Sequence, residues 1–309
     1  MCCKLTRMPL GVNLPLSEVI MSRLADLHRF GDCRASGILH QSKERAVNQH
    51  KYLLDNQAPE AGDRFRAFAD IFDPSTFRHM TGLGLARGWH CWEVGAGGTS
   101  VIRWLAEQVG PTGRVLATDI DLSWAREAAG AHVEICHHDV ARDEPPVETF
   151  DLVHARLVLV HLPDRDKALR SMFHSLKPGG WLLIEDADPA LQPLSCLGAH
   201  GLEQELANQI RRGFRSLLSA RGADLAFGRK LPRLLREAGL VNVAADAYFP
   251  VALQACIPLE IATVKMIRGE LIAHGVATAD EIDLHLANVA AGRLDLAQPP
   301  MISAWGRRP

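Results

Sequence analysis

A glycine-rich turn and a later acidic residue are the part of this chain best suited to ligand chemistry. In the segment HCWEVGAGGTSV, an apolar run delivers Glu93 and leads into Gly95-Ala96-Gly97-Gly98. Glycines adopt backbone angles closed to other residues and let a ligand lie against the main chain. Twenty residues after Thr99, the next apolar run ends in Asp119. A carboxylate there can accept both hydroxyls of a ribose, so the spacing predicts a nucleoside pocket; the alternative is a glycine turn beside a surface aspartate.

Three histidines stand near another acidic residue and raise the question of a metal site. His132, His137 and His138 precede Asp139 closely. Successive side chains of a strand point to opposite faces, so His137 and His138 cannot share an ion. No second carboxylate cluster stands at ligand spacing. We therefore predict no metal site.

The elements that must position these residues are short apolar runs alternating with helical patterns. Strands 1 to 5 are expected at residues 89–94, 114–118, 132–136, 150–155 and 181–185. The helices between them are expected at residues 99–109, 122–129 and 164–176. This alternation predicts a parallel sheet with helices on both faces. Later helices are expected at 199–219, 230–238, 258–274 and 279–290, and later strands at 241–249 and 301–305.

The segment before the sheet also has helical periodicity. Apolar residues recur at spacings of three and four in 16–27, and further helices are expected at 43–54 and 61–72. Asp73 and Pro74 then have the residue types of an N-cap and a first helical position, which predicts that a new helix starts there.

The glycine pattern distinguishes between two kinds of nucleoside. A dinucleotide site requires GxGxxG, and the last position here is Ser100. The segment instead resembles the first motif, E/D-x-G-x-G-x-G, of class I S-adenosylmethionine-dependent methyltransferases, with Thr99 in place of the last glycine. The group it resembles is the small-molecule type similar to ubiquinone and menaquinone biosynthesis enzymes. The segments ATDID, HHDV, FDLVHARLVLVHLPD and LKPGGWLLIED are similar to the later motifs, and the resemblance covers about residues 85–190 well.

The resemblance implies S-adenosylmethionine as the cofactor and a role for each matched residue. Those implied to lie at the methionine end are Glu93, Gly95, Ala96, Gly97, Ala155 and Arg156. Asp119 would hold the ribose, Ile120 would pack on the adenine, and Asp139 would accept from the adenine amino group, with Val140 beside it. Tyr52 and Arg64 lie in a segment similar to the helical lid of related enzymes, so either could close over the cofactor.

Methyl transfer requires little acid–base catalysis by the protein, because the sulfonium of S-adenosylmethionine is already an activated methyl donor. The enzyme aligns a nucleophile, excludes water and, for a hydroxyl, removes a proton. His161 is a candidate base and Arg156 a candidate for orienting an anionic acceptor. The alternatives are a helix-bracing histidine and a surface ion pair. The other titratable groups near the expected acceptor position are His154, Glu185, Asp186 and Asp188, of which His154 lies in a strand pattern typical of a packed residue.

Composition excludes several classes of protein. Apolar residues make up 47% and charged residues 23%, as in globular proteins, and the net charge is -2. No apolar run is long enough to span a bilayer, and seven scattered cysteines without a CxxC pair indicate reduced thiols. We therefore expect a cytoplasmic protein without membrane partners. Basic residues gather in 211–236, where solvated helix faces are favoured over an RNA-binding or acidic-ligand surface.

The sequence thus predicts a doubly wound α/β fold with a seven-stranded, Rossmann-like methyltransferase sheet closed by an antiparallel hairpin. The expected domains are a helical N-terminal lobe at 1–80 and a methyltransferase domain at 81–309 with a helical insert at about 190–228. The predicted function is methyl transfer to a small, largely apolar acceptor, at oxygen rather than carbon. An RNA or protein methyltransferase and a non-catalytic cofactor-binding protein are the alternatives, no nucleic-acid partner is expected, and a homodimer is left open.

Overall fold

Seven strands form one mixed sheet in the order β3-β2-β1-β4-β5-β7-β6. This is seen in a computed structural model, which describes residues 53–145 and 149–309. The strands are β1 (His90–Val94), β2 (Arg114–Asp119), β3 (Val133–His137), β4 (Phe150–Arg156), β5 (Leu176–Ala187), β6 (Val241–Tyr248) and β7 (Met301–Arg307). Strands β1 to β5 pair in parallel, and β7 runs antiparallel to both β5 and β6. The predicted fold class, with its closing antiparallel hairpin, is confirmed.

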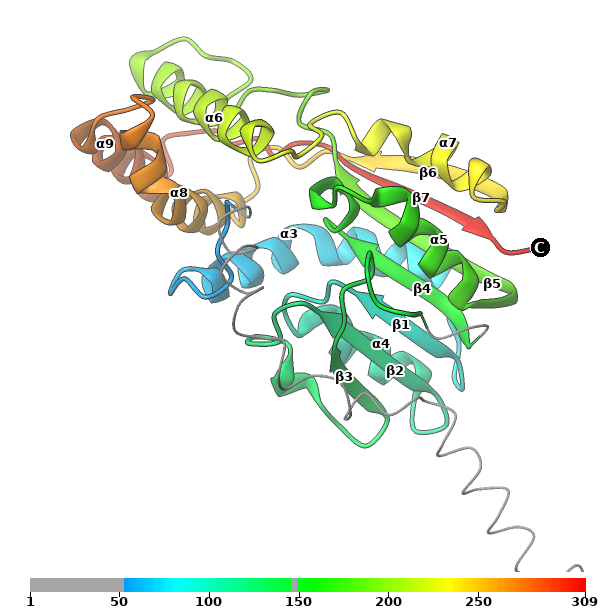
Figure 1. Cartoon of the computed structure of the whole chain (residues 1–309). Helices are drawn as coiled ribbons and strands as arrows, with labels where there is room; N and C mark the ends of the chain where they lie inside the picture. The colour runs from blue at the N-terminus through cyan, green and yellow to red at the C-terminus, as the bar shows by residue number, and fades with distance from the viewer. Residues whose placement is uncertain (1–52, 146–148) are drawn as a thin grey trace, which may run out of the picture. The chain divides into compact units, whose positions relative to one another are not determined.

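The helices fall into two sets around the sheet (Figure 1). One set covers its faces and comprises α3 (Ala61–Gly82), α4 (Ser100–Val109), α5 (Arg165–Ser175) and α7 (Leu231–Glu237). The other set packs together beyond the carboxyl end of β5 and comprises α6 (Leu202–Ala220), α8 (Cys256–Ala273) and α9 (Ala279–Ala290). Three short 3₁₀ turns are η1 (Arg126–Ala128), η2 (Leu159–His161) and η3 (Gly228–Lys230). None of the described helices is long and apolar enough to cross a membrane.

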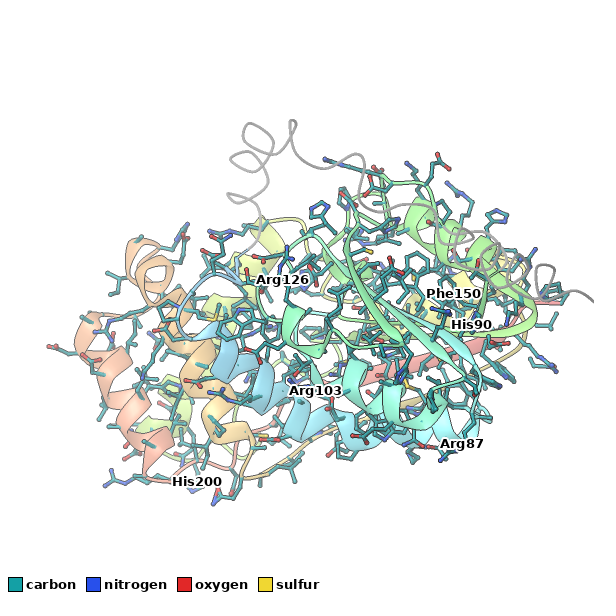
Figure 2. All side chains as sticks on the ribbon, turned by 90° about the horizontal axis from the view of Figure 1, so that it is seen from below. Arg87, His90, Arg103, Arg126, Phe150 and His200 are labelled. Carbon is teal, nitrogen blue, oxygen red and sulfur yellow. The ribbon has the colours of Figure 1, made fainter. Side chains whose placement is uncertain are left out.

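The burial of the strands explains why they form the centre of the molecule. β2 is buried at every position but its first, as expected for a parallel strand with helices on both faces. On one face, Ile102 and Leu105 of α4 pack against Cys91 of β1, together with Met80 of α3. The amino ends of the parallel strands lie at one edge of the sheet, where His90 begins β1 and Phe150 begins β4, both labelled in Figure 2. Asp119 and the glycine loop that follows β1 stand at the other, carboxyl edge.

The predicted break at Asp73 and Pro74 is wrong. α3 continues through Pro74 to Gly82. Pro74 is exposed, whereas Ile71 and Phe72 before it and Met80 after it are buried along one continuous face. Packing of that face holds the helix together across the proline, although the ring removes one main-chain hydrogen bond.

The predicted helix at 122–129 is also wrong, since only the 3₁₀ turn η1 forms there. The Asp121 carboxylate accepts hydrogen bonds from both the backbone amide and the hydroxyl of Ser123. Trp124 is held by a 2.7 Å hydrogen bond to the backbone oxygen of Asn56. Local side-chain hydrogen bonds of this kind compete with helix formation.

The predicted lobe at 1–80 lies mostly outside the described residues, so its boundary stays a prediction. Its described part, α3, packs against α8 and belongs to the same compact unit as the sheet. The insert predicted at about 190–228 contains α6 and its flanking loops.

Because Pro74 is exposed and its helix is continuous, replacing it should strengthen α3. We expect Pro74→Ala to raise the free energy of unfolding by about 1 kcal/mol. The variant regains the main-chain hydrogen bond that proline lacks, and this gain exceeds the cost of the greater conformational entropy of its unfolded chain. Urea denaturation measures this change. Thr81→Ala, at another exposed position of α3, is the control and should shift stability by less than about 0.5 kcal/mol. A loss of stability in Pro74→Ala would contradict the interpretation.

Candidate functional site

The glycine loop follows β1 at the carboxyl edge of the sheet. Gly95 and Gly97 have φ of 66° and 58°, which lie in the left-handed region that favours glycine. The amides of Gly95 and Ala96 donate to the Thr118 carbonyl at 2.8 and 3.0 Å. A Cβ on Gly97 would lie 2.8 Å from the ring of Phe65 in α3. The loop is therefore a main-chain cradle in which glycine is unstrained, whereas a larger residue at Gly95 or Gly97 would be strained and would clash with its neighbours.

Asp119 ties this cradle to the end of β2. Its Oδ2 accepts from the Gly97 amide, and its Oδ1 accepts from the Asp121 amide, both at 2.9 Å. Burial raises the pKa of Asp119 above its ordinary value, while these backbone hydrogen bonds act in the opposite direction. Each carboxylate oxygen has a second acceptor position, so the residue retains capacity for ribose hydroxyls.

The residues predicted to contact adenine gather at the same edge. The amide of His138, next to Asp139, donates to the Asp119 carbonyl at 3.1 Å, which joins the ends of β2 and β3. Ile120 is 60% exposed, so its side chain is available to a flat ring. Asp139 Oδ1 accepts from the amide of Ala141 at 3.0 Å, and Val140 is buried. The adenine contacts of Ile120, Asp139 and Val140 stay predictions. Tyr52 lies outside the described residues.

A buried imidazole joins three neighbouring strands beneath this edge. His154 of β4 is fully buried, and its Nδ1 lies 2.6 Å from Oε2 of Glu93 in β1. Its Nε2 lies 3.3 Å from Oε2 of Glu185 in β5. The sequence pattern indicated only a packed residue at His154. The available signal was that Glu93 and His154 each lie one residue before the end of their predicted strands, 89–94 and 150–155, and the observed parallel register does pair them.

Further polar groups complete the shell around Glu185. Its Oε1 accepts from the Ser303 hydroxyl at 2.6 Å, and its Oε2 accepts from the Thr76 hydroxyl. His79 lies between Glu185 and Asp246, 3.3 Å from the first and 2.8 Å from the second. The network therefore runs from the glycine-loop strand to α3 and to the edge strand β6.

The charges of this network shift the pKa values of its members. Burial by itself lowers the pKa of His154, but the Glu93 charge and the hydrogen bonds with Glu185 and Glu93 raise it to about 9. Burial by itself raises the pKa of Glu185, but hydrogen bonds with His154 and His79 hold it well below its ordinary value. His154 is thus an imidazolium at neutral pH, bound between two carboxylates.

The end of β4 presents the remaining predicted residues. Ala155 is buried between Val94 and Ile184 of the adjacent strands. Arg156 donates to Asp73 at 2.8 Å and to the hydroxyl of Thr76 at 2.9 Å. Its charge is therefore paired with α3, and its catalytic and cofactor-binding roles stay predictions.

His161 ends the turn η2 and faces an internal cavity. Burial lowers its pKa to about 4, and the nearby charges of Arg64 and Arg165 act in the same direction. The imidazole is therefore neutral at physiological pH, so it can accept a hydrogen bond but is a weak base. Its catalytic role stays a prediction.

The cavity has a volume of about 120 Å³ and lies where α3, α6 and α8 meet the loops after β4 and β5. Its wall is predominantly apolar and includes Phe68, Phe72, Leu157, Phe214, Leu225 and Val264. The polar groups include Arg64, His161, Thr263, Gln298 and the pair formed by Arg211 and Glu260. The cavity thus combines an apolar body with a few polar groups, as small-molecule sites do.

Neither Asp186, near the end of β5, nor Asp188, which follows the strand, lines this cavity. Asp186 is fully buried, and burial raises its pKa well above the ordinary value despite the amides of Val160 and Leu159. Asp188 accepts from the Arg229 guanidinium at 2.7 and 2.6 Å. The contacts with Arg229 indicate a structural role for Asp188.

Most cations of the basic segment have carboxylate partners. The pairs are Arg211 with Glu260, Arg221 with Glu270, Arg229 with Asp188, Lys230 with Asp224 and Arg233 with Glu237. Of the five cations in these pairs, only Arg211 is buried, and it lines the cavity. The segment therefore presents ion pairs to solvent over most of its length.

Comparison with known proteins gives this arrangement a family. The sequence profile of a methyltransferase domain matches residues 92–184. The ubiquinone/menaquinone biosynthesis C-methyltransferase UbiE of Bordetella parapertussis is 31% identical over 183 residues, which cover 50% of this chain and 70% of that protein. The chain belongs to the S-adenosylmethionine-dependent methyltransferases.

Two further similarities concern the length and the fold. The methyltransferase str2 of Strobilurus tenacellus is 35% identical over 146 residues, but the match covers only 45% of this chain and 48% of that protein. A phosphoethanolamine N-methyltransferase 2 of Haemonchus contortus, solved with phosphomonomethylethanolamine and S-adenosylhomocysteine, has a TM-score of 0.54 at 16% identity. That likeness covers 84% of this chain and 60% of the other, and shows the shared fold.

The cradle fits the family's cofactor, S-adenosylmethionine. Gly95 and Gly97 expose main chain at the end of β1, and the Asp119 carboxylate stands at the end of β2. Glu93 faces His154 directly, at 2.6 Å, so its own contact with the cofactor's amino group stays a prediction.

Substituting a loop glycine should separate cofactor binding from folding. Gly97→Ala strains the left-handed backbone and drives a methyl group into Phe65. We expect the affinity for S-adenosylhomocysteine, measured by calorimetry, to fall about tenfold or more. Gly98→Ala is the control, because its Cβ would meet Phe65 at an ordinary 3.6 Å. Equal affinities of the two variants would show that the cradle does not hold the ligand.

The His154 bridge should appear in the pH dependence of stability. Folding raises the pKa of His154 from 6.5 to about 9. The protonated imidazole therefore contributes its full stabilisation of the folded state below pH 6.5, and this contribution is lost as the pH rises through 9. The pKa of Glu185 is lowered by folding, so its pH dependence has the opposite sign. The ionised carboxylate contributes its full stabilisation of the folded state above pH 4.5, and this contribution is lost on acidification.

We expect the free energy of unfolding to fall by about 3 kcal/mol between pH 6.5 and 9 in the wild type. Urea denaturation at several pH values gives this slope. His154→Gln should lack that component, whereas His174→Gln, at an exposed position, should keep it. A His154→Gln protein with the wild-type slope would contradict the ionic bridge.

Proposed function

We propose that this protein transfers the methyl group of S-adenosylmethionine to a small, largely apolar molecule, at oxygen in preference to carbon. The observation that carries the proposal is the apolar cavity beside the carboxyl ends of β4 and β5. Its wall contains Leu157, next to Val158, whose side chain covers Gly95. An acceptor in the cavity would therefore lie close to the cofactor cradle. A cytoplasmic location is part of the same proposal.

The cofactor supplies an activated methyl group on a sulfonium, and the protein's contribution is alignment and exclusion of water. Phe68 and Phe72 of α3 and Phe214 of α6 enclose the acceptor with apolar surface. The cavity volume of about 120 Å³ is comparable with the roughly 150 Å³ apolar cavity that accepts benzene. The enclosed part of the acceptor is therefore about one ring in size.

Carbon methylation is the second candidate, because the Bordetella relative is named as a C-methyltransferase. Two groups favour oxygen. The neutral His161 can accept a hydrogen bond from an acceptor hydroxyl, and Arg64 brings a positive charge to the same cavity. An RNA or protein acceptor is less well supported, because the basic segment consists mainly of ion pairs.

The experiment that tests the function uses the purified full chain with S-adenosylmethionine and a panel of phenols, hydroxyquinones and polyketide-like compounds. Mass spectrometry detects the methylated product, and NMR places the methyl group on oxygen or carbon. A protein that fails to bind S-adenosylhomocysteine by calorimetry is not a methyltransferase. Binding without any product across the panel would favour a non-catalytic role.

Filling the cavity should block the acceptor but not the cofactor. Thr263 of α8 lines the cavity, so Thr263→Trp places an indole where the acceptor would lie. We expect kcat/KM with an acceptor found in the panel to fall more than about tenfold, and the dissociation constant of S-adenosylhomocysteine to change less than about twofold. Lys265→Trp, at an exposed position of the same helix, is the control. An unchanged kcat/KM would place the acceptor elsewhere.

A further inference from the structure

One arginine that lines the cavity has no carboxylate partner among residues 53–145 and 149–309. Arg64 of α3 is only 9% exposed and lines the cavity. Among the described residues, no carboxylate and no hydrogen-bond acceptor contacts its guanidinium, whose carbon lies 5.9 Å from the centre of the Phe65 ring. A cation in a sheltered, mainly apolar cavity attracts an anion more strongly than a cation in bulk water, so this guanidinium is suited to an anionic ligand.

The other arginines near the cavity are already satisfied. Arg211 pairs with Glu260 at 3.0 Å, and Glu260 also meets His285 at 3.1 Å. Arg156 pairs with Asp73, and Arg165 donates to backbone carbonyls after β4. Arg64 is thus the cation left uncompensated among the described residues that line the cavity.

The other titratable groups that line the cavity add no net negative charge, and Asp63, next to Arg64 on α3, is paired with Arg66. His161 of η2 is neutral at physiological pH, and the charges of Arg211 and Glu260 cancel within their pair. Thr263 and Gln298 are uncharged. The cavity therefore carries a net charge of one positive unit at Arg64, surrounded by apolar surface that strengthens its field.

We propose that Arg64 binds an anionic oxygen of the methyl acceptor, so that the substrates of this enzyme react as oxyanions, either phenolates or enolates. This inference rests on the proposed function. The acceptor hydroxyl loses its proton to water, and the guanidinium stabilises the oxyanion in the cavity. An oxygen lone pair then forms the bond to the methyl carbon, while the sulfur–carbon bond breaks and its electron pair stays on sulfur. No strong base is needed, in accord with the weakly basic His161.

The cofactor's own carboxylate is the competing source of an anion. The wall of the cavity places Arg64 with His161 and Leu157, on the acceptor side. The next residue, Phe65, is the one that covers the glycine loop at Gly97. The Arg64 guanidinium lies 5.9 Å from the centre of the Phe65 ring, so it stands between the glycine loop and the cavity. Because Arg64 lines the cavity, we assign its anion to the acceptor, and the cofactor's carboxylate is the alternative that the experiment separates.

The test uses 4-nitrophenol, a ring-sized acid whose ionised form absorbs visible light, with protein saturated by S-adenosylhomocysteine. We expect binding to lower the pKa of the probe by about one unit, equivalent to about tenfold tighter binding of the phenolate than of the phenol. Arg64→Gln should abolish the shift, and Arg64→Lys should retain part of it. Arg66→Gln is the matched control, since Arg66 lies on the same helix, exposed and paired with Asp63.

Two further measurements identify the source of the anion. Calorimetry compares S-adenosylhomocysteine with its decarboxylated analogue in the wild type and in both Arg64 variants. The proposal is supported if both Arg64 variants bind the two ligands as tightly as the wild type does and the pKa of the probe is shifted in the wild type. If Arg64→Gln or Arg64→Lys lowers the affinity for S-adenosylhomocysteine but not for its decarboxylated analogue, Arg64 binds the carboxylate of the cofactor and the proposal is overturned.

The wild type alone also decides the matter, independently of how the variants fold. An unshifted pKa of bound 4-nitrophenol overturns the anion site while leaving methyl transfer intact. A shifted pKa in a protein that does not bind S-adenosylhomocysteine, measured with the probe alone, supports the anion site and refutes the proposed function.

Discussion

The ionic bridge from Glu93 through His154 to Glu185 is the interaction on which the geometry of this site depends. It links β1, β4 and β5, the three strands at the middle of the sheet, just below the edge where ligand-binding loops begin. Burying two carboxylates is unfavourable unless a cation and hydrogen bonds compensate them. Because Glu93 stands two residues before Gly95, fixing its side chain also fixes the start of the glycine loop.

The same bridge determines where α3 lies over the sheet. Glu185 accepts from Thr76, Asp73 binds Arg156, and His79 meets both Glu185 and Asp246. Polar contacts along the carboxyl-terminal half of the helix thus attach it to three strands. Its amino-terminal half is thereby held against the glycine loop and the cavity, where it contributes Phe65 and Arg64. A structural ion network in the core in this way positions residues at the ligand.

The parts of the site that could be predicted from sequence are those encoded in one short segment. The glycine loop is a contiguous run, and Asp119 follows Gly97 by only 22 residues at the end of the next strand, so their pattern is visible in the chain. His154 depends on carboxylates 61 and 31 residues away, so periodicity alone indicated only packing. Sheet architecture was predictable because strand burial is repetitive. Pro74 was misread because tertiary packing, rather than local preference, keeps α3 continuous.

The apolar cavity could not be predicted for the same physical reason. Its wall comes from α3, α6, α8 and two strand-end loops, none of which has a pattern of its own. Net charge was equally uninformative, because the conspicuous cations of 211–236 are mostly neutralised by nearby carboxylates. Arg64 stands outside any basic cluster and yet lacks a carboxylate among the described residues. Which charge remains without a carboxylate partner in a sheltered place is a property that only the packed structure determines, and it is the basis of the anion site proposed at Arg64.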